Sequence, residues 1–130
     1  MASGHFAVSS SSIESLYATA HWLMQSERYA DAACVFRAMM IGRPEDERGW
    51  LGLGGCHEIL GDKELALDLY ETARTIAAPA PRCELARAKL LLARGEWRAA
   101  EEALIDAIAM APAESTDEIS DLAKKILGTP

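Results

Sequence analysis

The stretch WLGLGGCHEILGD, residues 50–62, carries three glycines within four positions, although the spacing of its apolar residues predicts a helix. Each glycine in a helix interior costs about 0.8–1.0 kcal/mol relative to alanine, so the three together cost on the order of 2–3 kcal/mol. Close packing against a neighbouring helix or close approach of a ligand backbone would offset this cost. A nucleotide-binding loop is excluded, because its G-x-x-x-x-G-K-S/T motif follows a strand, and Gly61 is followed here by Asp62 rather than lysine.

The pattern of small and bulky residues around this stretch recurs every 34 positions. Its first occurrence consists of Leu16, Ala20, Leu23, Tyr29, Ala32, Phe36, Met39 and Pro44. The second consists of Trp50, Gly54, His57, Lys63, Ala66, Tyr70, Ala73 and Ala78, with Pro79 just beyond. The third consists of Glu84, Ala88, Leu91, Trp97, Ala100, Leu104, Ala107 and Pro112. Lys63 and Glu84 depart from the pattern, but this period is typical of the tetratricopeptide repeat, a helix–turn–helix unit.

The repeat predicts an all-α protein, a tetratricopeptide-repeat solenoid of three helix–turn–helix repeats and a C-terminal capping helix that covers its open end. We expect the repeats at residues 13–46, 47–80 and 81–114, and the capping helix at 116–127. Residues 13–127 would form a single domain, and residues 1–12 would form a flexible N-terminal lead-in.

The predicted turns and helix crossings require particular residue types. Gly61 and Gly95 stand where the first helix of a repeat ends, because glycine readily takes the left-handed conformation of a helix C-terminus. Glu27 occupies this place in the first repeat. The paired helices must cross at short range, so small residues are expected at the crossings: Ala20, Ala32, Gly54, Ala66, Ala88 and Ala100.

Composition indicates the fold class, and net charge disfavours some classes of binding partner. Half of the 130 residues are hydrophobic but only 6% are aromatic, which favours an all-helical fold. The net charge of −7 disfavours nucleic acids and anionic membrane surfaces as partners. The chain has no apolar run of the roughly 18 residues that a membrane span needs, so we expect no stable membrane association. The three cysteines are expected to be buried, reduced thiols of a cytoplasmic protein.

Catalytic and metal-binding motifs are absent from the sequence. Cys56 and His57 are adjacent, but neighbouring residues on a helix point about 100° apart and do not face each other. The histidines lack the spacing of a ligand pair, and the cysteines form no C-x-x-C pair. We therefore expect neither an enzyme nor a bound metal or cofactor.

The first helix of each repeat is expected to line a concave, peptide-binding groove. Its positions 2, 5, 9 and 12 give Glu14, Tyr17, His21, Met24, Arg48, Leu51, Gly55, Glu58, Arg82, Leu85, Lys89 and Leu92. The centre of this set is apolar, and Arg48, Arg82 and Lys89 place positive charge on its rim. Such a trough suits an extended peptide with spaced hydrophobic anchors. The alternative is that the capping helix or a second subunit covers some of these residues.

The three repeats resemble those of the class II chaperones of bacterial type III secretion, the SycD/LcrH family. The resemblance rests on LYATAHWLMQSERYADAACVFRAM, DERGWLGLGGCHEILGDKELALDLY and APRCELARAKLLLARGEW, which together span most of residues 13–112. The Leu-Gly-Leu-Gly-x-Cys run at residues 51–56, followed by Gly61, is its most specific part.

The resemblance implies a non-enzymatic, cytoplasmic bacterial chaperone. Such a protein binds a short extended segment of hydrophobic translocator subunits in its groove and keeps them soluble before secretion. By resemblance, Tyr17 matches a groove tyrosine, whereas His21 and Met24 stand where the family often has aromatic residues. The resemblance also allows a homodimer. Two alternatives stay open: a chaperone of the needle subunit or another secretion-apparatus protein, and a generic tetratricopeptide scaffold for protein–protein interaction.

Overall fold

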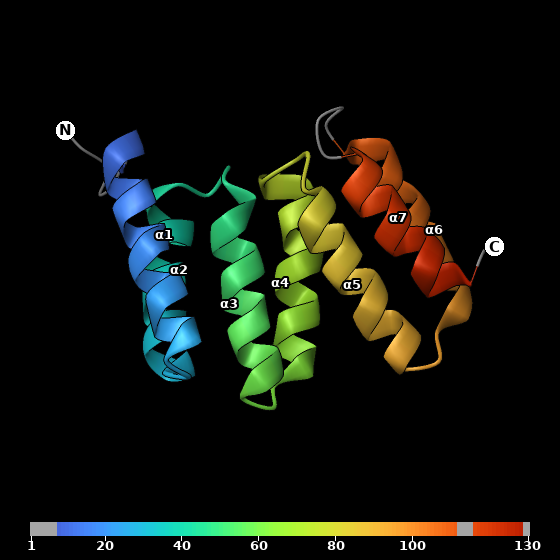
Figure 1. Ribbon diagram of the computed structural model, residues 1–130, viewed down its shortest axis with the longest axis horizontal. Coiled ribbons are helices and arrows are strands. Elements are labelled where there is room, and N and C mark those ends of the chain that lie inside the picture. Colours follow the sequence, from blue (N-terminus) through green and yellow to red (C-terminus); the bar gives the residue numbers. More distant parts are fainter. Residues whose placement is uncertain (1–7, 112–115, 129–130) are drawn as a thin grey trace. The chain divides into compact units, whose positions relative to one another are not determined.

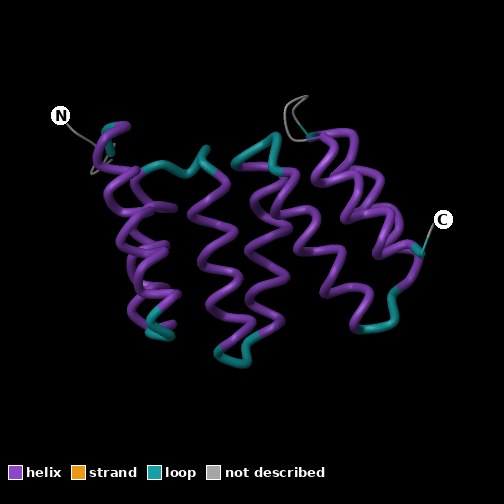
Figure 2. The backbone as a smooth tube through the Cα atoms, in the orientation of Figure 1, coloured by secondary structure: helices purple, strands orange, loops and turns teal. Residues whose placement is uncertain are grey.

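Seven helices make up the part of the chain that the computed structural model describes, residues 8–111 and 116–128 (Figure 1). They are α1 (Ser10–Gln25), α2 (Tyr29–Gly42), α3 (Glu47–Ile59), α4 (Lys63–Ile76), α5 (Pro81–Ala93), α6 (Trp97–Met110) and α7 (Thr116–Leu127). Short loops join most of them, and the described ranges contain no strand (Figure 2). The predicted fold class, three helix–turn–helix pairs and a final helix, is therefore confirmed.

Contacts between residues group the chain into two compact units, residues 1–69 and 70–130, with the boundary inside α4. In the N-terminal unit, α2 packs against both α1 and α3. In the C-terminal unit, α5 packs against α6, and α7 packs against both. The sequence predicts one domain over 13–127, whereas the internal contacts are concentrated within these two units.

Fully buried alanines lie at the positions where paired helices are expected to cross. Ala20 of α1 and Ala32 of α2 have no exposed surface, and neither do Ala88 of α5 and Ala100 of α6. The distance between packed helices depends on the side chains at their contact, so alanine lets the two backbones approach closely. The burial expected at these positions is confirmed.

The turn inside each repeat contains one residue with a left-handed backbone. Gly61 has a φ of 94° and Gly95 a φ of 78°, as expected for glycines that end a helix. Glu27 takes the same conformation, with a φ of 59°, although it is not a glycine. Its N–H donates to the carbonyl of Met24 at 3.0 Å, which satisfies a terminal carbonyl of α1 and helps to hold this conformation.

The first helix begins earlier than expected. Ser9 caps α1, and its side-chain oxygen accepts a hydrogen bond from the backbone N–H of Ser12 at 3.2 Å. Serine is among the favoured residues at a helix N-cap because it satisfies such an orphan donor. Residues 10–12 are therefore helical, and the prediction that the flexible lead-in extends to residue 12 is wrong. The remainder of that prediction, residues 1–7, lies outside the described residues.

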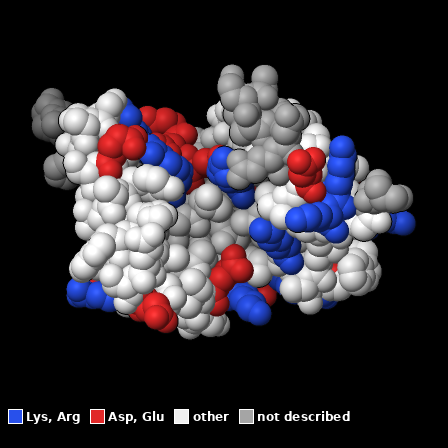
Figure 3. All heavy atoms as spheres, viewed as in Figure 1, with Lys and Arg blue, Asp and Glu red and all other residues white. Residues whose placement is uncertain are grey.

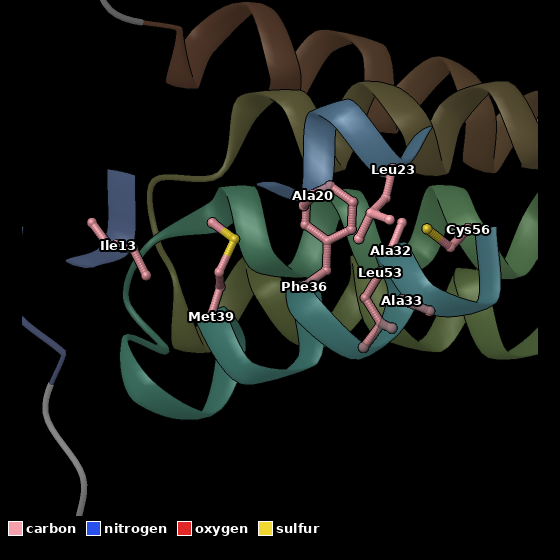
Figure 4. Packing of buried hydrophobic residues seen from close by; sticks show 9 residues of the cluster. All are labelled: Ile13, Ala20, Leu23, Ala32, Ala33, Phe36, Met39, Leu53 and Cys56. Atoms are coloured by element: carbon pink, nitrogen blue, oxygen red, sulfur yellow. The ribbon is translucent and has the colours of Figure 1, made fainter. Parts of the chain in front are cut away.

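The core of the N-terminal unit combines buried residues of α1, α2 and α3 (Figure 4). Its members are Ile13, Ala20, Leu23, Ala32, Ala33, Phe36, Met39, Leu53 and Cys56. Leu23, Phe36 and Met39, bulky positions of the 34-residue pattern, are at most 7% exposed. Trp50 is also buried, and its Nε1 donates to the carbonyl of Pro44 at 2.8 Å. Ala20, Leu23, Ala32, Phe36 and Met39 of this core are positions of the 34-residue pattern, whereas its other members are not.

The glycines of α3 have different physical roles. A Cβ atom placed on Gly52 would overlap the buried ring of Phe36, so the absence of a side chain there is required by packing. A Cβ atom on Gly55 would meet no atom within 4 Å. Packing therefore accounts for Gly52 and leaves Gly55 without a steric reason.

The third repeat departs from the pattern at two positions. Trp97, in the row of bulky residues, is 69% exposed. Glu84 is fully buried and accepts hydrogen bonds from Nε and Nη2 of Arg87 at 3.0 and 3.2 Å. Nε of Arg74 lies 3.3 Å from the same carboxylate, and Nη2 of Arg74 lies 3.5 Å from Asp106. This ionic network joins α4, α5 and α6 and compensates the burial of a carboxylate.

The cysteines differ in burial. Cys56 and Cys83 are buried as expected, but Cys34 on α2 is exposed, so the expectation of three buried thiols is wrong. Burial raises the pKa of the Cys56 thiol to about 11, which keeps it protonated and unreactive at neutral pH.

We predict that Gly52→Ala lowers the free energy of unfolding by about 1–2 kcal/mol. Overpacking against Phe36 costs about 1–3 kcal/mol, which exceeds the roughly 1 kcal/mol gained in helix propensity. The matched control is Gly55→Ala on the same helix, which should be neutral or more stable by up to about 1 kcal/mol. Urea unfolding followed by circular dichroism measures both variants, and equal changes would contradict the packing role of Gly52.

Glu84→Gln is expected to lower the free energy of unfolding by about 1–3 kcal/mol, because the fully buried carboxylate loses its charge-assisted hydrogen bonds from the partly buried Arg87 and its ion pair with the exposed Arg74. The control is Glu96→Gln, since the Glu96–Arg94 pair is exposed and such pairs contribute about 0–1 kcal/mol. Thermal unfolding of the two variants at one protein concentration provides the comparison. A Glu84→Gln variant as stable as the control would mean that the charge of Glu84 is not needed.

Candidate functional site

A small apolar pocket lies in the N-terminal unit and has a volume of about 180 Å³. Its lining residues come from α1, α2 and α3: Tyr17, His21, Met24, Phe36, Arg48, Leu51 and Gly52. Sites for small molecules usually measure about 300–1,000 Å³, so this pocket is suited to a single side chain rather than to a whole cofactor.

Helix geometry brings the lining residues together. Tyr17, His21 and Met24 follow one another at intervals of four and three residues, so they share one face of α1. On α3, Arg48 precedes Leu51 by three residues and Gly52 by four, so both lie on its side of the helix. Because α2 packs against both helices, the ring of Phe36 on α2 completes the pocket next to Gly52.

Aromatic contacts shape one wall of the pocket. The ring centroids of Tyr17 and His21 lie 6.2 Å apart, with an interplanar angle of 59°. The guanidinium carbon of Arg48 lies 4.7 Å from the centroid of the Tyr17 ring, within the range of a cation–π interaction. Tyr17 is thus held between a residue of its own helix and a residue of α3.

Arg48 is anchored by two carboxylates. Its Nη1 and Nη2 donate to the two oxygens of Glu14 at 3.0 and 2.7 Å, which ties α3 to α1. Its Nε and Nη2 donate to the two oxygens of Asp46 at 3.1 and 2.8 Å. Asp46 also caps α3, since its Oδ1 accepts the backbone N–H of Arg48 at 3.0 Å. The expectation that Arg48 offers positive charge to a ligand is therefore wrong, because its charge is already paired.

The hydrogen bonds from Arg48 hold the pKa of Glu14 and that of Asp46 below their usual range. Their partners in turn raise the pKa of Arg48. Both carboxylates and the guanidinium consequently stay charged from mildly acidic to alkaline pH. The rim of the pocket keeps the same charge pattern throughout that range.

The pocket brings together part of the predicted groove. Tyr17, His21, Met24, Arg48 and Leu51 all line it. Gly55 and Glu58, also on α3 and partly buried, do not line the pocket.

The predicted groove residues of the C-terminal unit differ in how exposed their side chains are to solvent. Arg82 and Lys89 of α5 are exposed, and Leu92 is partly buried. Leu85 is only 7% exposed, so it is a core residue, and the expectation that its side chain lies open to a ligand is corrected.

Two lining residues, Phe36 and Gly52, were not among the predicted groove residues. Phe36 belongs to the row of bulky residues in the 34-residue pattern, and it is only 4% exposed. Gly52 follows Arg48 by four residues, so its place on the same helix face was the available signal. Because Gly52 has no side chain, the buried ring of Phe36 forms part of the pocket wall. Phe36 therefore belongs to both the core and the pocket.

The sequence analysis also considered a membrane-spanning helix and a metal site. Within residues 8–111 and 116–128, no helix combines the length and apolar character needed to cross a membrane. Over the same ranges, no three His, Cys, Asp or Glu side chains gather as potential ligands of a metal ion.

Comparison with known proteins gives the family. The sequence matches the family model described as Tetratricopeptide repeat over residues 17–81 and 85–116. Low calcium response locus protein H of Yersinia pestis is 36% identical over 97 residues, which make up 75% of this chain. The chain spans 58% of the length of that relative, less than two thirds.

Solved structures of similar sequence match a larger share of the chain. The type III secretion chaperone SycD of Yersinia enterocolitica, in complex with a peptide of the translocator YopD, is 33% identical, with a TM-score of 0.78. The match covers 92% of each chain. PcrH from Pseudomonas aeruginosa is 28% identical, with a TM-score of 0.81 over 98% of this chain and 97% of that one. The repeat period, the helix pairs and these similarities show that the chain belongs to the tetratricopeptide-repeat family of type III secretion translocator chaperones that includes SycD.

Proposed function

We propose that this chain is a non-enzymatic chaperone of the bacterial cytoplasm. It binds a short extended segment of a hydrophobic translocator protein and keeps that protein soluble until secretion. The observation that carries the proposal is the apolar pocket between α1, α2 and α3, in a chain that is 33% identical to a chaperone solved with a translocator peptide.

The pocket takes one aliphatic side chain of the client. Tyr17, Met24 and Leu51 are all partly buried, so they provide apolar surface that is open to a ligand. Full burial of a valine or leucine side chain contributes about 1.5–3 kcal/mol. One such anchor is too little for a stable complex, because association also costs translational and rotational freedom. The client must therefore supply further contacts outside this pocket.

Gly55 supports an extended conformation of the client. It lies one turn after Leu51 on α3, and no atom occupies the space next to it. A peptide backbone can approach the helix there without meeting a side chain. In an extended segment alternate side chains point to the same side, so anchors spaced by two residues could reach neighbouring sites. A further contact of the same segment would fall on Glu58, the next predicted groove residue of α3.

Leu51→Asp is expected to weaken binding of the translocator by at least about tenfold. The change removes apolar contact from the pocket and places a carboxylate where the client buries an aliphatic group. The measurement is co-expression with the translocators of the same genome, followed by size-exclusion chromatography with light scattering. The matched control is Ile41→Asp, because Ile41 is 59% exposed on α2 and does not line the pocket.

The outcomes separate function from fold. A soluble stoichiometric complex with the unaltered chain and with Ile41→Asp, but not with Leu51→Asp, supports the proposal. If the translocators stay insoluble while a needle subunit or another envelope protein co-elutes, the fold stands and the proposed function is wrong.

As a control for folding, the circular dichroism spectrum of Leu51→Asp must match that of the unaltered chain. Leu85→Asp, at a buried position, is expected to lose helicity instead.

Gly55→Leu is expected to weaken binding of an extended client by about tenfold or more, because the added side chain fills the open space beside α3. Gly55→Ala should bind with nearly the affinity of the unaltered chain, since a single methyl group leaves most of this space free. Isothermal titration with the bound translocator segment measures both affinities. Equal affinities for the two variants would show that the client does not pass Gly55.

A further inference from the structure

The charged cluster beside the pocket, formed by Glu14, Asp46 and Arg48, has little capacity left to bind an anion. Each carboxylate receives two hydrogen bonds from the guanidinium, at distances between 2.7 and 3.1 Å. A guanidinium has five N–H donors, and these bonds use most of them. A carboxylate of a ligand would have to displace Glu14 or Asp46 before it could pair with Arg48.

The cluster carries an excess of negative charge. Two carboxylates face one guanidinium, and the neighbouring Arg43–Glu45 pair, with a separation of 3.6 Å, adds no net charge. Glu14 is the exposed member, with 62% of its side-chain surface accessible. Figure 3 shows acidic and basic atoms side by side where α1 and α3 begin. Since Arg48 lines the pocket, this excess lies at the pocket's edge.

We propose that the Glu14–Arg48–Asp46 cluster determines specificity for the client: it favours a lysine or arginine next to the aliphatic anchor and disfavours an aspartate or glutamate there. The inference rests on the proposed function, since it concerns the segment that occupies the same pocket. The anchor enters the apolar pocket while the adjacent cationic side chain pairs with the exposed carboxylate of Glu14. Arg48 acts as a positioning residue that holds both Glu14 and the Tyr17 ring in place.

The expected preference is modest because Glu14 is exposed to water. Pairs between exposed charges change a binding constant by about two- to fivefold. Such an effect is screened by salt, because the Debye length falls from about 10 Å at 0.1 M to about 3 Å at 1 M ionic strength. Burial of the aliphatic anchor is much less sensitive to salt, so the two contributions can be separated.

The experiment uses synthetic peptides that cover the translocator segment protected from proteolysis in the co-purified complex. The residue next to the anchor is varied among lysine, glutamine and glutamate. Affinities are measured by titration at about 0.1 M and about 1 M sodium chloride, at one constant pH. Three proteins are compared: the unaltered chain, Glu14→Gln, and the control Glu101→Gln, at an exposed position of α6.

The unaltered chain and Glu101→Gln should bind the lysine peptide about two- to fivefold more tightly than the glutamine peptide, and the glutamate peptide least tightly, at low salt only. Glu14→Gln should lose most of this order. Equal binding of the three peptides, or the same order in Glu14→Gln, would overturn the inference and leave the proposed function intact. If none of the peptides binds any of the proteins, the proposed function fails as well.

Discussion

The close crossing of paired helices at fully buried alanines is the constraint on which the rest of the structure depends. Ala20 and Ala32 in one unit, and Ala88 and Ala100 in the other, have no exposed surface. Extra methylene groups in a packed interior typically cost about 1–3 kcal/mol, so these positions tolerate little growth. Because the crossing fixes how each helix is rotated, it also decides which residues of α1 and α3 remain for binding.

The candidate site follows from this arrangement. With α2 packed against both α1 and α3, the apolar side chains of the two outer helices that do not reach the core surround a small pocket. Gly52 leaves room for the ring of Phe36, which therefore belongs to the core and to the pocket at once. Recognition at such a site depends on shape and on the charges at its edge, which suits a protein that holds a segment of another chain.

The sequence predicted the fold well because a 34-residue period directly reflects a repeated helix pair. The turns and the buried alanines followed from the same period, whereas the left-handed backbone of Glu27, which stands where a glycine is expected, is known from the structure. Interactions between side chains were harder to predict. Glu84 departed from the repeat, and only the structure places arginines of α4 and α5 around it. Arg48, a predicted groove residue, lines the pocket, but its partner Glu14 lies one full repeat earlier, a distance at which sequence alone gives no sign of pairing.

The most direct test of the account is methyl NMR of the methionines during titration with the bound translocator segment. Met24 lines the pocket, and Met39 is 1% exposed in the core of the same unit. We predict that the Met24 methyl resonance shifts and saturates at a stoichiometric amount of the segment, while the Met39 resonance stays nearly unchanged. Binding of the segment with an unchanged Met24 resonance would contradict the claim that this pocket holds the client.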